Sequence, residues 1–387
     1  MKKLVSFVLI FFLVFQLITP VYAEELNENQ LYSLSAAMID GNNGRLLYGK
    51  NPNEQRAMAS TTKIMTLILA LEYGNLEDII TVSSYASKMP DVQLGIKEGE
   101  QYKLGDLVYS MMLESHNDVA VAIAEHVGGD LESFINMMNK KAMEIGLSNT
   151  YFLTPNGLDM EDESGKHSST AYEMCLIMKY CVMDSPMKEE FMAICQTRQY
   201  TFSDYNNKRT FTVDNKNALL DKMDNVLAGK TGFTVDAGYC YVCAVSYEDK
   251  VYIVALLGCG WPNNKGYKWK DVTKLIDYGK SEFEYVKIID RTYDIGEIKV
   301  IDGIQDDKTK LYVTDEIELL LCKDDKVDII CENKDVIYAP VTRGDVVKKL
   351  NIYINDEFYT SVNVYAEDSI DKIDLSYWVY RIFDMYF

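Results

Sequence analysis

The spacing of apolar residues divides the chain into a region rich in predicted helices and a later region of short strands. Leu34–Asp40 and Arg45–Gly49 predict a β-hairpin around an Asp-Gly-Asn-Asn-Gly turn. Apolar residues three and four positions apart then predict helices over Ala59–Glu72, Leu104–Leu113, Asp118–Val127, Leu131–Ile145 and Thr170–Met183. β-branched and aromatic residues without helical periodicity predict strands over Leu227–Thr234, Gly238–Ser246 and Val251–Cys259, and a helix follows over Lys270–Tyr285.

Strands at both ends of this region, with helices between them, are typical of one α/β domain whose sheet joins segments distant in sequence. We place that domain at residues 24–284. Residues 285–366 show short strands only, which predicts a smaller all-β domain. These strands span Ile298–Ile301, Leu311–Val313, Ile317–Cys322, Val327–Cys331, Val346–Tyr353 and Phe358–Tyr365.

The final segment, residues 367–387, carries an amphipathic helical pattern. Asp374, Arg381 and Asp384 share one side of a helical wheel, and apolar side chains share the other. The apolar side consists of Leu375, Trp378, Val379, Ile382, Phe383 and Tyr386. Such an aromatic-rich stripe is typical of a helix lying in a membrane surface, so we expect a C-terminal membrane anchor. The acidic polar face weakens attraction to anionic lipids, and a helix packed on its own protein or a frayed end is the alternative.

The N-terminus has the pattern of a cleavable secretory signal. Lys2 and Lys3 precede the apolar run Leu4–Phe15, and the residues up to Ala23 suit cleavage before Glu24. Polar residues and a proline interrupt the run before it reaches the ~20 residues of a membrane span. We therefore assign residues 1–23 to a signal peptide and expect an exported, extracytoplasmic protein.

A formal net charge of −20 on 387 residues argues against nucleic acid as a partner. The excess of negative charge repels phosphate backbones, and no run of Lys or Arg concentrates positive charge on one face. With 48% hydrophobic and 25% charged residues, the composition is that of a folded globular protein with a large core.

Eight cysteines in an exported chain raise the question of disulfides. Cys322 and Cys331 flank a predicted hairpin turn and could face each other across it. The alternative is that the cysteines are free thiols buried among apolar side chains. Cys240 and Cys243 lie inside a predicted strand, where odd spacing sends them to opposite faces, which argues against a redox or zinc site.

Three short motifs occur in order along the α/β region. Ser60–Lys63 reads Ser-Thr-Thr-Lys and opens a predicted helix, Ser115–Asn117 reads Ser-His-Asn, and Lys230–Gly232 reads Lys-Thr-Gly in a predicted strand. Ser-x-x-Lys also occurs at Ser185–Lys188 and Ser369–Lys372, which we attribute to chance. Lys-Thr-Gly occurs once, against about 0.1 expected from the composition. The ordered triple therefore indicates a catalytic site.

These residue types suit nucleophilic acyl transfer. A serine hydroxyl needs a base, and the i, i+3 spacing at a helix start puts Ser60 and Lys63 on one face. Lys63 can be that base only if burial and a nearby positive charge, which Lys230 could supply, favour its neutral form. At a helix N-terminus the backbone N–H of Ser60 can also bind an oxyanion, with a second donor expected at Phe233.

A serine–histidine hydrolase is the competing interpretation. His116 lies between Ser115 and Asn117 and could touch the cleft, but no motif gives it the role of a base. His126 falls in a helical, core-like segment, and we interpret it as structural.

The motifs resemble those of the serine-type D-alanyl-D-alanine carboxypeptidases, the low-molecular-mass penicillin-binding proteins. The resemblance runs from about Leu34 to Glu284 and includes Thr154–Leu158, His167–Ala171 and Asn217–Leu220. It implies a β-lactamase- or transpeptidase-like α/β domain with an antiparallel sheet and a helical cluster. Similar proteins carry a β-rich second domain and often a C-terminal amphipathic anchor.

Carried onto this chain, the resemblance implies an acyl-enzyme mechanism that needs no metal or cofactor. Ser60 attacks the carbonyl of the penultimate D-alanine of a peptidoglycan stem peptide, Lys63 is the general base, and Ser115 relays a proton to the leaving amine. The residues expected to bind the substrate are Asn117, Lys230, Thr231, Gly232 and Phe233. The lysine and threonine of this set receive the terminal carboxylate. Penicillin is expected to mimic the substrate and acylate Ser60.

Two departures from the family pattern concern substrate preference. His116 replaces the usual glycine of the second motif, where it could crowd or tune the cleft. The usual arginine near the substrate carboxylate is missing, and Lys216 is the candidate replacement, with Lys265 and Lys268 as others.

Two further functions stay open. One is a β-lactamase of the same fold, although the chain lacks a recognisable acidic deacylation loop, and the other is an inactive penicillin-sensing or wall-binding relative.

Overall fold

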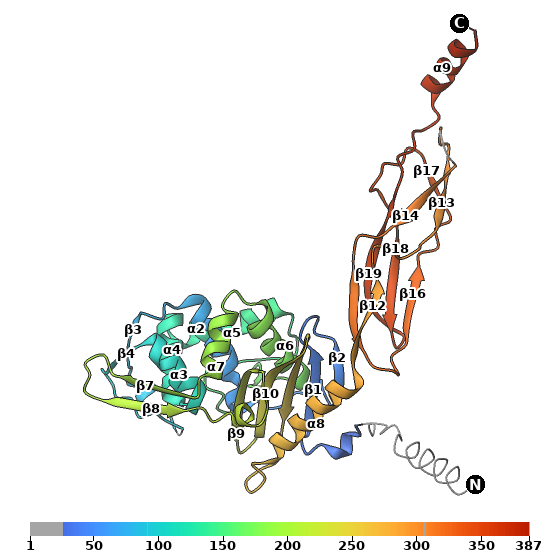
Figure 1. Ribbon diagram of the computed structural model, residues 1–387. Helices are drawn as coiled ribbons and strands as arrows, with labels where there is room; N and C mark the ends of the chain where they lie inside the picture. Colours follow the sequence, from blue (N-terminus) through green and yellow to red (C-terminus); the bar gives the residue numbers. More distant parts are fainter. Residues whose placement is uncertain (1–25, 91, 305–306, 387) are drawn as a thin grey trace, which may run out of the picture. The chain divides into compact units, whose positions relative to one another are not determined.

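The computed structural model describes residues 26–90, 92–304 and 307–386. The predicted signal peptide, residues 1–23, lies outside these described residues. Contacts divide the chain into two units, the first ending at Ser281 and the second beginning at Glu282 (Figure 1).

A five-stranded antiparallel sheet forms the centre of the first unit, in the order β2-β1-β11-β10-β9. Its strands are β1 (Ser35–Asp40), β2 (Leu46–Lys50), β9 (Val226–Thr234), β10 (Gly238–Tyr247) and β11 (Lys250–Leu257). Because β1 pairs with β11, Ser35 lies opposite Leu257. The prediction of one sheet that joins distant segments is confirmed, and β9, which carries Lys-Thr-Gly, is an edge strand of this sheet.

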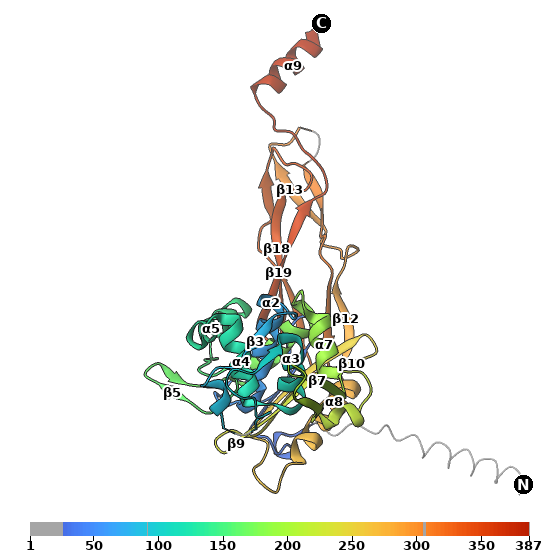
Figure 2. The same ribbon diagram turned by 90° about the vertical axis from the view of Figure 1, so that its left-hand side faces the viewer.

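Helices cover both faces of the sheet. The helices of the cluster on one face are α2 (Lys63–Tyr73), α3 (Leu104–Glu114), α4 (Asn117–Gly128), α5 (Leu131–Ile145), α6 (Ala171–Lys179) and α7 (Lys188–Gln196) (Figure 2). The main apolar core lies between them and the sheet, and it includes Ala37 and Ala255 from the strands and Ile68 from α2. On the other face lies α8 (Tyr267–Glu282), whose Gly279 packs against Tyr252 of β11.

Short elements complete the first unit. The short helical turns are η1 (Glu28–Gln30), η2 (Ala59–Thr62), η3 (Ala86–Lys88), η4 (Tyr180–Asp184) and η5 (Ala218–Asp221). Three two-stranded sheets pair β3 (Ile79–Thr81) with β4 (Gln101–Lys103), β5 (Glu161–Asp162) with β6 (Gly165–Lys166), and β7 (Gln199–Ser203) with β8 (Thr210–Asp214).

The predicted helices form, with local differences. The helix expected from Ala59 begins with the tight turn η2, and the one expected to reach Met183 changes to a π-helical turn at Tyr180. The helix expected to reach Tyr285 ends at Glu282, because the next residues form strand β12.

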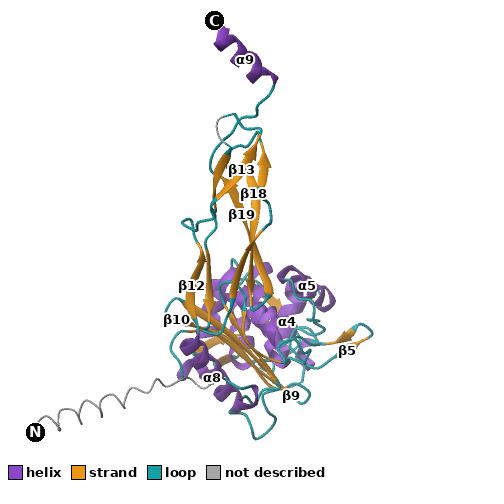
Figure 3. Cartoon of the chain, turned by 90° about the vertical axis from the view of Figure 1, so that its right-hand side faces the viewer, coloured by secondary structure: helices purple, strands orange, loops and turns teal. Residues whose placement is uncertain are grey.

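The second unit is all-β except for its last helix (Figure 3). A six-stranded sheet has the order β16-β18-β19-β14-β13-β17, and β12 pairs with β15. The strands are β12 (Glu284–Ile289), β13 (Glu297–Ile301), β14 (Lys308–Tyr312), β15 (Ile317–Leu321), β16 (Val327–Cys331), β17 (Val336–Tyr338), β18 (Val346–Ile354) and β19 (Glu357–Ala366). Val300, Leu350 and Val364 belong to a second apolar core. The helix expected near the C-terminus is present as α9 (Leu375–Tyr386).

The hairpin predicted between Cys322 and Cys331 is wrong. β15, which precedes Cys322, pairs with β12, whereas β16, which ends at Cys331, pairs with β18. All eight cysteines are free thiols, and six of them are buried. The alternative interpretation as free thiols is therefore the one that the structure supports.

Candidate active site

The turn η2 brings Ser60 to the start of α2, beside the edge strand β9. Ala59, the residue before it, has a φ of +48°, a left-handed conformation that non-glycine residues rarely adopt. Two glycines make room for this turn. A Cβ on Gly157 would overlap the carbonyl oxygen of Ala59, and a Cβ on Gly232 would lie 2.9 Å from the nitrogen of Ser60.

Lys63 is fully buried, and its side chain ends among three oxygen atoms. Its Nζ lies 3.0 Å from Ser60 Oγ, 2.9 Å from Asn117 Oδ1 and 2.5 Å from the carbonyl oxygen of Asn156. The predicted contact between Ser60 and Lys63 is thus formed, and Asn117 of the second motif joins them.

The surroundings of Lys63 favour its neutral form. Burial, and secondly the positive charge of Lys230, hold the pKa of Lys63 well below its usual value, while Asp118 opposes this shift. A neutral amine has two N–H donors and one lone pair. If the donors go to the acceptors Asn117 Oδ1 and Asn156 O, the lone pair faces the hydroxyl of Ser60.

The second motif joins α3 to α4. Ser115 caps α3 with a φ of +74°, and its buried hydroxyl has no hydrogen-bond partner within the described part of the chain. Asn117 begins α4 and donates from Nδ2 to the carbonyl oxygen of Pro90 and from its backbone N–H to Val92. Asp118 accepts from the backbone N–H groups of residues 94–96, so this motif also holds the neighbouring loop.

His116 turns its imidazole toward α3. Its Nδ1 lies 2.8 Å from Ser110 Oγ, and its Nε2 lies 3.4 Å from a carboxylate oxygen of Glu114. Burial lowers the pKa of His116, which favours a neutral ring that donates to Glu114 and accepts from Ser110. Lys216, the candidate for the substrate carboxylate, is also engaged here, because its Nζ lies 2.7 Å from Glu114.

The third motif lies along β9. Lys230 is buried and Gly232 packs against the Ser60 turn, while Thr231 between them is half-buried and lies opposite Tyr241 of β10. Burial lowers the pKa of Lys230 to about 7, and its Nζ donates to the carbonyl oxygen of Thr231 at 3.0 Å. Phe233 follows Gly232 in β9, lies opposite Tyr239 of β10 and is partly exposed.

Sequence reasoning missed the role of Asn156. The segment Thr154–Leu158 is part of the resemblance to the family. However, the group of Asn156 that contacts Lys63 is its backbone carbonyl, which any residue type provides. The available signal was Gly157, whose φ of +84° and close approach to Ala59 require glycine.

The remaining histidines lie away from Ser60 Oγ. His126 is partly exposed, with its Nε2 3.2 Å from Asp78. His167 is buried and contacts Thr62 rather than Ser60. No group of three metal-binding side chains suited to a metal ion is found in the residues that the structure describes.

A serine hydroxyl held against a buried lysine, with an asparagine and a second buried lysine beside it, is an arrangement suited to serine acyl transfer. Comparison with known proteins gives the family. A family model described as D-alanyl-D-alanine carboxypeptidase matches residues 22–259, and one described as the C-terminal domain of penicillin-binding protein 5 matches residues 283–372. The chain belongs to the D-alanyl-D-alanine carboxypeptidase family.

Individual relatives support the same family assignment. D-alanyl-D-alanine carboxypeptidase DacF of Bacillus subtilis is 30% identical over 387 residues, which cover 96% of this chain and 95% of that protein. DacA of Haemophilus influenzae is 29% identical, covering 89% of this chain and 86% of that protein. The crystal structure of penicillin-binding protein 5 from Haemophilus influenzae superimposes with a TM-score of 0.70 at 28% identity, covering 90% of this chain and 100% of that one. The predicted transpeptidase-like fold with an all-β second region is confirmed.

The chain is thus a serine-type D-alanyl-D-alanine carboxypeptidase, a hydrolase, and its family acts on the D-Ala-D-Ala ends of peptidoglycan and binds β-lactams.

Proposed function

We propose that Ser60 is the nucleophile of this carboxypeptidase and Lys63 its general base. The observation that carries the proposal is the position of Lys63 Nζ, 3.0 Å from Ser60 Oγ and within hydrogen-bond distance of two fixed acceptors. The neutral amine takes the hydroxyl proton as Oγ attacks the carbonyl of the penultimate D-alanine. The backbone N–H groups of Ser60 and Phe233 bind the oxyanion that forms.

Ser115 and Asn117 serve the later part of the acylation step. The unpartnered hydroxyl of Ser115 is available to pass a proton to the departing D-alanine amine. Asn117 holds Lys63 through its side-chain oxygen and positions the substrate amide. Water then attacks the ester on Ser60, and the shortened peptide leaves.

Lys230, Thr231 and Gly232 form the part of the site that receives the end of the substrate. The buried ammonium of Lys230 and the hydroxyl of Thr231 are suited to the terminal carboxylate, which is a natural partner for a charged donor. Gly232 lets β9 approach the Ser60 turn closely. We assign a smaller part to Lys216, because Glu114 already pairs with it.

Mass spectrometry after mixing with penicillin tests this assignment. We expect an adduct that peptide mapping places on Ser60 and that is absent from the S60A variant. An adduct at another residue, or an unchanged adduct in S60A, would refute the assignment. Rapid loss of penicillin without a lasting adduct would instead support a β-lactamase.

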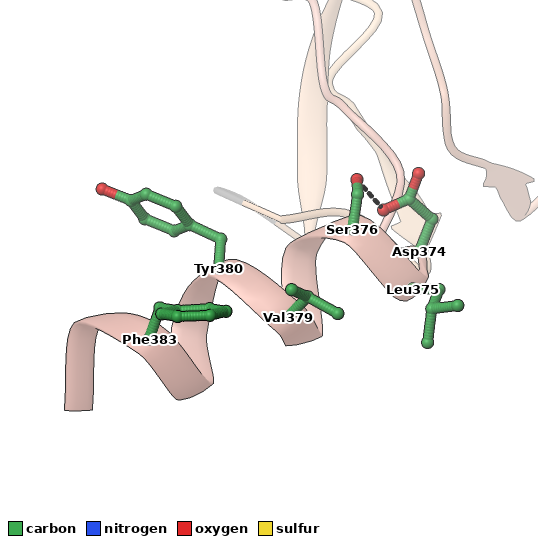
Figure 4. Close-up of a pocket in the computed structure, with 6 residues that line it drawn as sticks. All are labelled: Asp374, Leu375, Ser376, Val379, Tyr380 and Phe383. Carbon is green, nitrogen blue, oxygen red and sulfur yellow. Dashed lines mark hydrogen bonds between the residues drawn. The ribbon is translucent and has the colours of Figure 1, made fainter. Parts of the chain in front are cut away.

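We also propose that residues 1–23 are an export signal, that residues 24–284 and 285–366 are the catalytic and β-rich domains, and that residues 367–387 attach the enzyme to a membrane surface. Among the described residues no helix has the length and apolarity to cross a membrane. Support for surface attachment comes from α9, on which Leu375, Val379 and Phe383 are 79%, 46% and 59% exposed (Figure 4). Burying such side chains in the headgroup region is favourable.

Sedimentation with phospholipid vesicles tests the attachment. The full mature chain should sediment with vesicles, and a chain ending before Asp374 should stay in solution. V379D, which places a charge on the apolar face, should release the full chain, while Y377D, on the side of the helix that carries Asp384, serves as the matched control. Equal sedimentation of the full and shortened chains would refute the proposal.

A further inference from the structure

Three hydrogen bonds in series lead from the backbone of Leu153, through a buried histidine, to the peptide group that precedes Ser60. The backbone N–H of Leu153 donates to His167 Nδ1 at 2.9 Å. The other ring nitrogen, Nε2, lies 2.9 Å from Thr62 Oγ1. Thr62 Oγ1 in turn donates to the carbonyl oxygen of Ala59 at 2.8 Å.

The direction of each bond in the series is fixed. A backbone N–H can only donate, so His167 Nδ1 must be the acceptor and the ring hydrogen must sit on Nε2. Nε2 therefore donates to Thr62, which leaves the hydroxyl hydrogen of Thr62 for the Ala59 carbonyl. His167 is deeply buried, and burial lowers its pKa to about 4, so the ring is neutral at physiological pH.

The last acceptor in the series belongs to the same peptide group as the N–H of Ser60. A trans peptide unit is planar, and its C=O and N–H point in opposite directions. A bond that fixes the carbonyl oxygen of Ala59 therefore also fixes the direction of the Ser60 N–H. On that side of the peptide group Gly232 of β9 approaches the Ser60 nitrogen.

This peptide group needs such support. Ala59 has a φ of +48°, a left-handed conformation that is unfavourable for a residue with a Cβ. Gly157 packs directly on the Ala59 carbonyl and restrains it from one side. In addition, a carbonyl that accepts a hydrogen bond polarises its peptide unit and strengthens the N–H as a donor.

We propose that His167 is a positioning residue that acts through Thr62 to aim and polarise the Ser60 N–H toward the oxyanion of the reacting carbonyl. His167 does not touch the substrate in this assignment. The proposal rests on the role of Ser60 proposed above. It predicts that losing the series weakens binding of the transition state and leaves binding of the ground-state substrate unchanged.

Two pairs of matched variants separate this role from simple packing. H167Q keeps an amide donor near the position of Nε2, whereas H167N keeps only an acceptor near Nδ1, which preserves the bond to Leu153. T62S keeps the hydroxyl, whereas T62V replaces it with a methyl group of similar size. We expect H167N and T62V to lower the rate of Ser60 acylation by penicillin by about 10- to 100-fold, since removal of a whole oxyanion donor costs about 100- to 1,000-fold.

H167Q and T62S should stay within about threefold of the native rate, and the H167N/T62V double variant should lose little more than either single variant. KM for the peptide should stay unchanged while kcat falls. Infrared spectroscopy of the penicillin acyl-enzyme supplies a further readout, because the ester carbonyl stretch should move to higher frequency when the oxyanion donor weakens.

If H167N acylates as fast as H167Q, or if the carbonyl stretch is unchanged in H167N and T62V, His167 is only a packing residue. Both outcomes require that the native chain is labelled at Ser60. A native chain that is not labelled there would refute the proposed role of Ser60 instead.

Discussion

Lys63 Nζ lies 2.9 Å from Asn117 Oδ1, which ties the first motif to the second across 54 positions of sequence. The amide oxygen accepts a hydrogen bond without carrying a charge. It can therefore orient the lysine amine and still leave the neutral form favoured. A carboxylate of the same shape at this position would stabilise the ammonium form instead.

The variant N117D tests this relationship. A carboxylate beside Lys63 should raise its pKa, because the negative charge stabilises the ammonium form. Acylation of Ser60 at pH 7 should fall correspondingly and should recover as the pH is raised. The measurement is the penicillin acylation rate from pH 6 to 10. N117A should lower the rate without moving its pH dependence upward, so an equal shift in both variants would contradict the argument.

Lys230 predicts how substrate capture depends on pH. Burial lowers its pKa to about 7, so the ammonium form that attracts a carboxylate is present below that pH and is lost above it. Loss of this charge also removes one cause of the lowered pKa of Lys63. We expect kcat/KM for a D-Ala-D-Ala peptide to fall as the pH rises above about 7. In K230R, whose guanidinium stays charged, this fall should disappear even if the rate is lower.

At Gly157, the addition of a single methyl group is expected to stop catalysis. Its φ is +84°, and a Cβ would overlap the carbonyl oxygen of Ala59. G157A should destabilise the fold and displace Ser60, so that penicillin labelling is largely lost. Gly146 has a similar φ of +88° with nothing near its Cβ position. G146A should therefore cost only about 1–2 kcal/mol and keep labelling, and equal behaviour of the two variants in thermal melts and labelling would contradict the packing argument.

His167 predicts a loss of stability in acid. Its pKa lies near 4 in the folded chain, against 6.5 for an exposed histidine, because burial disfavours the charged ring. Between these values the unfolded chain binds more protons, so the unfolding free energy is highest above pH 6.5 and falls as the pH drops toward 4. The full difference is about 3 kcal/mol. Urea unfolding at pH 7 and pH 4.5 should show a smaller drop for H167Q than for the native chain, and parallel drops would contradict this account.

Much of the site followed from residue types and spacing, because the helix period brings Ser60 and Lys63 together locally. The strand pattern likewise placed Lys230 in β9. The contact to Asn156 could not be predicted, since it uses a backbone carbonyl that comes from a distant loop. The direction of the His116 side chain also depended on tertiary packing, because its partner Ser110 lies on α3.

The fold shows the same division between local and distant information. The helices from residue 59 to 145 carry strong apolar periodicity and were predicted closely. The hairpin of β7 and β8 was missed, because each strand buries only one side chain, Phe202 and Val213. Around Tyr285 the aromatic residues extend a helical pattern, yet they form β12 because β15, which comes later in the chain, supplies a pairing partner.

The most direct test of the central claim is the release of D-alanine from a peptide ending in D-Ala-D-Ala, measured for the native mature chain, S60A and K63M. The account predicts steady release by the native chain and none above background by S60A. K63M should be slower than native by at least about 100-fold, since the general base is gone. Release by S60A at a rate near that of the native chain would contradict the assignment of Ser60 as the nucleophile, and native-like release by K63M would contradict that of Lys63 as its base.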